Sequence, residues 1–163
     1  MVDRIPQVLK PTYEPLEVLM RSLCLTLSLS LSLIAGAWAA DPAAEQAKLQ
    51  GKWQAVAAER NGAPASDVVG HELAITGNRF QITHNGRLLY GGTCTLDPEA
   101  QPARIEFRQD EGANLRGEWK GIYRLDAGRL EIVDNADDMS KPPPTQFATR
   151  PGSGYLLVRF TRH

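Results

Sequence analysis

Short turn dipeptides set between alternating apolar and polar residues are the feature that most constrains the fold of this chain. Asn61–Gly62, Gly77–Asn78, Asn85–Gly86 and Ala127–Gly128 each separate stretches that are rich in β-forming residues. Dipeptides of this kind favour tight turns between antiparallel strands. The pattern predicts a short helix over 41–49 and strands near 51–60, 72–76, 79–84, 87–96, 103–108, 118–126, 129–134 and 155–162.

Register tests these hairpins, because a two-residue turn determines which side chains face each other. The turn at Ala127–Gly128 matches apolar with apolar and charged with oppositely charged residues: Asp126 with Arg129, Leu125 with Leu130, Arg124 with Glu131 and Tyr123 with Ile132. The turn at Gly77–Asn78 sets Ile75 beside Phe80 and Leu73 beside Ile82. The hairpin at Asn85–Gly86 alternates less cleanly, which predicts a longer loop or a β-bulge at Gly91–Gly92.

One face of the predicted strands is apolar and the other is charged, as expected for a sheet with one buried and one wet face. We therefore predict an all-β fold, a single antiparallel up-and-down β-barrel of about eight strands, with a sandwich as the alternative. The predicted inner face consists of Trp53, Ala55, Ala57, Leu73, Ile75, Phe80, Ile82, Ile105, Phe107, Trp119, Tyr123, Leu125, Leu130, Ile132, Leu156, Val158 and Phe160.

The first part of the chain has the pattern of a secretion signal. Residues 20–39 combine a basic Arg21, a Leu-rich run and a terminal Ala-x-Ala, which predicts a signal peptide cleaved before Ala40 and an exported protein. A retained membrane anchor is the alternative, but the apolar run is short and broken by serines, so the processed form is expected to have no membrane span. Residues 1–19 are interpreted as a mis-annotated upstream extension, 40–48 as a lead-in, and 49–163 as the barrel domain.

Charge and cysteine content narrow the function classes. The chain has 18 Lys and Arg against 19 Asp and Glu, and the part after residue 39 keeps this balance, so it offers no basic field for nucleic acid. Cys24 lies in the predicted signal segment. Only Cys94 remains after cleavage, which rules out an internal disulfide in the processed chain. Cys94 is expected to pack as a small apolar group, with an intermolecular bridge or a reactive thiol as the alternatives.

Several segments are similar to those of a known family. "LQGKWQ", "ERNG", "GIYRLDAGRLEI" and "PPTQFATRPGSGYLLV" resemble uncharacterised exported domains of planctomycetes that are described as lipocalin-like, and the match runs from about Leu49 to Arg162. The resemblance implies a lipocalin-type barrel whose base is plugged by the Trp of the first strand. It implies no known activity, and the sequence lacks further motifs of true lipocalins, so ligand binding is inferred from the fold alone.

Two function classes remain open from the sequence. The first is a binding module for a small apolar or amphipathic molecule, with Trp53, Phe107, Trp119 and Tyr123 as the pocket wall. The second is a filled barrel that acts through its outer surface as an envelope or extracellular interaction module. The sequence contains no phosphate-binding loop, nucleophile elbow or Cys–His nucleophile pair, so no enzymatic activity and no cofactor are predicted. It predicts no oligomeric state.

A metal site is a weaker hypothesis. Register places His71 opposite His84, and Glu59 would join them if its side chain pointed the same way as that of Trp53. Rim histidines are more often solvated, so we do not predict a metal.

The sequence also makes predictions for three loop segments. The acidic loop 134–139 is expected to be a solvated loop rather than a calcium site. Residues 109–118 are expected to be a connector, and 140–154 an extended segment that covers one barrel end, with Phe147 anchored in the core.

Overall fold

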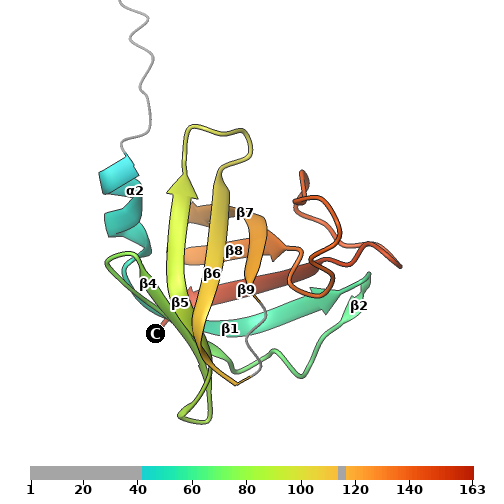
Figure 1. The fold of residues 1–163 in the computed structure, drawn as a ribbon, viewed down its shortest axis with the longest axis horizontal. Helices are drawn as coiled ribbons and strands as arrows, with labels where there is room; N and C mark the ends of the chain where they lie inside the picture. Colours follow the sequence, from blue (N-terminus) through green and yellow to red (C-terminus); the bar gives the residue numbers. More distant parts are fainter. Residues whose placement is uncertain (1–41, 114–116) are drawn as a thin grey trace, which may run out of the picture. The chain divides into compact units, whose positions relative to one another are not determined.

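The computed structural model describes residues 42–113 and 117–163, so the predicted signal peptide and the segment before it lie outside the described residues. The described chain contains one helix and nine strands (Figure 1): α2 (Pro42–Leu49), β1 (Gly51–Arg60), β2 (Ala63–Pro64), β3 (Glu72–Thr76), β4 (Arg79–His84), β5 (Arg87–Asp97), β6 (Arg104–Gly112), β7 (Glu118–Asp126), β8 (Arg129–Asp134) and β9 (Leu156–Arg162). No helix in this part of the chain has the length and apolar character needed to cross a membrane.

The strands form a closed antiparallel barrel. Neighbouring strands follow the order β1-β3-β4-β5-β6-β7-β8-β9, and β9 pairs back onto β1, while the two-residue β2 extends the far end of β1. The predicted fold class is therefore confirmed: eight strands make an up-and-down barrel, and closure removes the open edges that a sandwich would leave.

The two test hairpins have the predicted register. Leu125 pairs with Leu130 and Tyr123 with Ile132 across β7 and β8, and Ile75 pairs with Phe80 across β3 and β4. Ala127 has φ 45° and Gly128 φ 78°, the positive values that a tight turn between right-twisted strands requires.

The hairpin at Asn85–Gly86 corrects part of the prediction. Its loop has two residues, and the bulge lies in β5 where Leu89 is passed over, so that Thr83 pairs with Leu88 and Ile82 with Tyr90. A second bulge lies at the predicted glycines, but in the pairing of β5 with β6. The glycine at position 92 is required because a Cβ there would overlap the Arg108 carbonyl.

The barrel interior is densely packed at the end near α2. Trp53 is completely buried, its Nε1 donates a hydrogen bond of 2.8 Å to the Leu49 carbonyl, and the Arg162 guanidinium lies 4.3 Å from its ring centre. Arg162 also donates to the carbonyls of Lys48 and Gln50. These contacts tie the helix and the last strand to the first strand and close this end, which we call the base.

Three expectations about loops and faces were wrong. β6 continues to Gly112, so only the part of 109–118 after that residue connects strands. Phe147 packs with Tyr155 over Ile122, Val133 and Leu157 in a separate cluster, because these side chains face outward from the barrel. The segment before β9 thus covers the outer wall rather than an end.

Ala57 does not join the inner face. A bulge at Val56 pairs Ala57 with the outward Arg159, and Ala58 packs against the core instead.

Candidate ligand cavity

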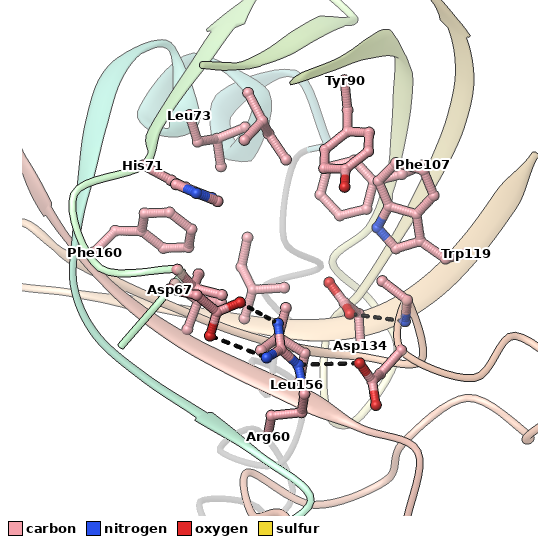
Figure 2. A pocket seen from close by; sticks show the side chains of 16 residues that line it. Arg60, Asp67, His71, Leu73, Tyr90, Phe107, Trp119, Asp134, Leu156 and Phe160 are labelled. Carbon is pink, nitrogen blue, oxygen red and sulfur yellow. Dashed lines mark hydrogen bonds and ion pairs between the residues drawn. The ribbon is translucent and has the colours of Figure 1, made fainter. Parts of the chain in front are cut away.

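A cavity of about 210 Å³ lies inside the barrel at the end away from the base. Its apolar wall consists of Val68, Leu73, Ile82, Tyr90, Phe107, Trp119, Ile132, Ala136, Leu156, Val158 and Phe160, and its polar lining of Arg60, Asp67, His71, Asp134 and Asp137. Figure 2 shows Tyr90, Phe107 and Trp119 gathered on one side, His71 and Phe160 on the opposite side, and Arg60 with Asp67 below them. The barrel is therefore filled at one end and hollow at the other.

The aromatic wall is held by ring packing. Phe107 and Trp119 face each other across β6 and β7 and stack with centroids 5.3 Å apart, while Phe80 meets both rings edge-on from behind. Tyr90 lies edge-on to Trp119 at 6.4 Å. Such a network leaves the rings little freedom, so this wall is preformed. The indole nitrogen of Trp119 and the hydroxyl of Tyr90 point toward the cavity (Figure 2).

The bulge at Val56 decides which end residue of β1 faces the cavity. Without it, Glu59 would share the face of Trp53 by simple alternation. With it, Arg60 pairs with the inward Leu156 and Glu59 with the outward Leu157. The register change therefore exchanges an anion for a cation in the barrel interior.

Arg60 is held by two carboxylates from two loops. Its Nη1 and Nη2 donate to Asp67 Oδ1 and Oδ2, each at 3.0 Å, and its Nε lies 3.0 Å from Asp137 Oδ1. The hydrogen bonds with Asp67 are the main cause that raises the pKa of Arg60 and lowers that of Asp67. The fork geometry is the strong form of this ion pair. It orients the guanidinium at the rim of the cavity.

Asp134 is a second acidic residue of the cavity lining, and it is more buried than Asp67. It ends β8 on the inward face, is 7 % exposed, and pairs with Gly121 of β7. A Cβ at position 121 would overlap the Val133 carbonyl oxygen and lie 2.8 Å from the Asp134 Cβ, so the glycine allows the two strands to approach closely here. Asp134 Oδ1 accepts a hydrogen bond from the Ala136 amide at 3.0 Å.

The acidic loop that follows is not simply solvated, as the sequence led us to expect. Asn135 is buried, accepts a hydrogen bond from the Lys120 amide and donates one to the Lys141 carbonyl. Asp137 contacts Arg60 and also accepts from Asn61 Nδ2 at 2.9 Å. Side-chain bonds therefore give this loop a defined course past the cavity.

The two predicted histidines come together, and Glu59 does not. The rings of His71 and His84 lie edge-to-face at 4.8 Å, and only His71 lines the cavity. Burial, followed by the nearby His84, lowers the pKa of His71, which favours its neutral form. Glu59 instead accepts a hydrogen bond from the Thr149 hydroxyl on the other side of the strand. Within residues 42–113 and 117–163, no three His, Cys, Asp or Glu side chains are grouped as a metal site would need.

Two of the four predicted pocket residues line the cavity. Phe107 and Trp119 do, whereas Trp53 belongs to the packed base. Tyr123 is buried with no hydrogen-bond partner for its hydroxyl among the described residues, and burial is the main cause that raises its pKa to about 12. Alternation placed all four inward but could not tell which level of the barrel is hollow.

Sequence reasoning missed the polar half of the lining: Arg60, Asp67, Asp134 and Asp137. A signal for one of them was present, because Asp134 continues the inward series Leu130 and Ile132. Comparison of the chain with protein-family models, curated proteins and solved structures finds no match. What the cavity holds is therefore inferred from its own geometry.

Proposed function

We propose that this barrel binds a small amphipathic molecule in the cavity between the aromatic wall and the Arg60–Asp67 pair. The observation that carries the proposal is a partly enclosed, mainly apolar space with charged groups at its rim, the combination typical of ligand sites. Apolar cavities left empty lose packing contacts and so cost stability. Because the aromatic wall leaves this space unfilled in spite of that cost, we favour a binding role for the barrel over a purely structural one. The sequence resemblance to exported lipocalin-like domains points the same way, and we propose that binding takes place outside the cytoplasm.

The volume limits the ligand. A space of about 210 Å³ corresponds to about seven waters at their share of liquid volume, roughly 30 Å³ each, and lies below the roughly 300 Å³ at which drug-sized pockets begin. The proposal therefore names molecules about the size of one aromatic ring with a short polar arm. Long fatty acids and sterols exceed this space.

Tryptophan fluorescence tests the proposal with a built-in control. In a full-length Trp38→Phe, Trp53→Phe variant, Trp119 is the only indole left and reports from the cavity wall. Phenethyl alcohol, phenethylamine and hydrocinnamate share one tail and differ in their polar group. At least one of them is expected to shift the Trp119 emission saturably. The Trp38→Phe, Trp119→Phe variant reports from the base through Trp53 and should give no shift.

The outcomes separate the two function classes. A saturable response of Trp119 with a silent Trp53 supports the cavity as a ligand site. If none of the three compounds binds, and native mass spectrometry finds no small molecule retained by the protein from its own host, the proposal fails. The alternative class, a barrel that acts through its outer surface as an envelope or extracellular interaction module, would then be favoured.

A further inference from the structure

The charges that line the cavity select the polar group of the ligand. Resting on the function proposed above, we infer that the ligand is a small aromatic or aliphatic amine whose ammonium group binds at Asp134 and Asp137. Four observations support this assignment of amines as the ligand class.

The first observation is the charge balance of the lining. One cation, Arg60, faces three carboxylates, those of Asp67, Asp134 and Asp137. His71 adds no charge at neutral pH, because burial favours its neutral form. The lining therefore has a surplus of negative charge, and the Asp134 part of it is buried, where water screens a charge less than it does at the surface. A ligand cation reduces this surplus, and a ligand anion increases it.

The second observation is that Arg60 is already engaged. Its two terminal nitrogens donate to the two oxygens of Asp67 at 3.0 Å each, and its Nε lies 3.0 Å from Asp137 Oδ1 as an ion pair without a hydrogen bond. A ligand carboxylate would have to displace Asp67 from a two-pronged pair. Arg60 therefore acts as a brace that holds two carboxylates in place, rather than as an anchor for an anion.

The third observation is the position of Asp134. Asp134 ends a barrel strand opposite Gly121, and its side chain lines the cavity. The hydrogen bond from the Ala136 amide holds the carboxylate at the lining of the cavity.

The fourth observation is the aromatic wall on the opposite side. Phe107 and Trp119 offer ring surface to the apolar tail of an amine, and aromatic faces also attract cations. A molecule with a ring at one end and an ammonium group at the other therefore matches both sides of the cavity (Figure 2).

Calorimetric titration of the full chain with the three tail-matched compounds tests the inference. Phenethylamine is expected to bind about tenfold more tightly than phenethyl alcohol, the usual gain of a charge-assisted over a neutral hydrogen bond. Hydrocinnamate is expected to bind most weakly. Added salt should weaken the binding of phenethylamine and leave the affinity for phenethyl alcohol unchanged.

Two variants locate the charge effect. Asp134→Asn keeps the size and the acceptor for the Ala136 amide but removes the charge, so the advantage of the amine over the alcohol should disappear while the affinity for the alcohol stays the same. Asp137→Asn should reduce the advantage and keeps the test valid if the Asp134 variant does not fold, which circular dichroism would show. Asp126→Asn is the matched control, since Asp126 is an exposed turn residue near the base.

Each possible result either supports or overturns the preference for an amine. Equal affinity for the amine and the alcohol would overturn the inference and leave the cavity as a ligand site. Tightest binding of hydrocinnamate would overturn it in favour of Arg60 as an anchor. Binding of none of the compounds would overturn the inference, and it would remove the proposed function as well if native mass spectrometry also finds no small molecule retained by the protein. Preference for the amine that is lost in Asp134→Asn and kept in Asp126→Asn supports it.

Discussion

Replacing Trp53 by alanine tests whether the base is the main source of barrel stability. The side chain is completely buried against the core, its Nε1 bonds the Leu49 carbonyl at 2.8 Å, and Arg162 covers its ring. The alanine variant loses ring packing, the hydrogen bond and the stacked guanidinium together. Because α2, β1 and β9 meet at this residue, the space left behind cannot collapse without moving the helix.

The expected loss is large. Truncation of a buried Trp to alanine costs about 3–5 kcal/mol of unfolding free energy. For a domain of this size, about 4 °C of melting temperature is lost per kcal/mol, so the midpoint should fall by about 12–20 °C. Trp53→Phe keeps a ring but leaves the buried Leu49 carbonyl without its donor, which costs about 1–3 kcal/mol.

Urea unfolding followed by far-ultraviolet circular dichroism measures these losses without relying on the tryptophan that is changed. Trp119→Ala is the matched control, because it removes the same side chain from a wall that already borders a cavity. Its loss should be clearly smaller than that of Trp53→Ala. A Trp53→Ala variant within about 1 kcal/mol of the parent chain, well under the usual cost of a core truncation, would refute the assignment of the base as a packed core.

Three further outcomes are expected. Because the pKa of His71 is lowered on folding, folded His71 takes up a proton less readily than unfolded His71, so stability should fall as the pH drops below the ordinary value of 6.5. In the His71→Gln variant, the melting temperature should depend less on pH between about pH 8 and pH 5 than it does in the parent chain. An unchanged pH dependence would assign the acid sensitivity to other groups. Gly121→Ala should destabilise the protein by about 1–3 kcal/mol, since the new Cβ would overlap the backbone carbonyl of Val133 and crowd the Asp134 Cβ; a urea midpoint equal to that of the wild type would contradict this packing. Cys94 is buried and its pKa is raised by burial, so a thiol reagent should label it only after denaturant is added; rapid labelling of the native protein would be inconsistent with its place in the core.

The hairpins show how much of the fold could be predicted from local pattern. Turn dipeptides and alternation placed most strands within a residue or two of their observed ends, because both signals act between neighbours in sequence. Side-chain contacts across a tight hairpin then follow from register alone, as the Tyr123–Ile132 and Ile75–Phe80 pairs show. The aromatic half of the cavity was accessible for the same reason.

The polar half of the cavity was not accessible in this way. A single bulged residue, Val56, reverses the faces of Glu59 and Arg60, and nothing in the local sequence marks it. Arg60 then meets Asp137, 77 positions along the chain, in a loop whose acidic composition suggests only solvation. The bulge thereby separates Glu59 from the two histidines and brings Arg60 to the cavity, where His71 and three aspartates also line the wall.

The sequence by itself determined antiparallel strands with one apolar face, because turn chemistry and a two-residue period leave a face that must be buried; that this sheet closes into a barrel follows from the pairing of β9 with β1. Only the tertiary structure decided where that interior is filled and where it is hollow, and which charges border the hollow. The physical reason is that packing volume and inward charge depend on bulges, strand closure and loop contacts between residues far apart in the chain, and a one-residue shift in any of these exchanges one face for the other.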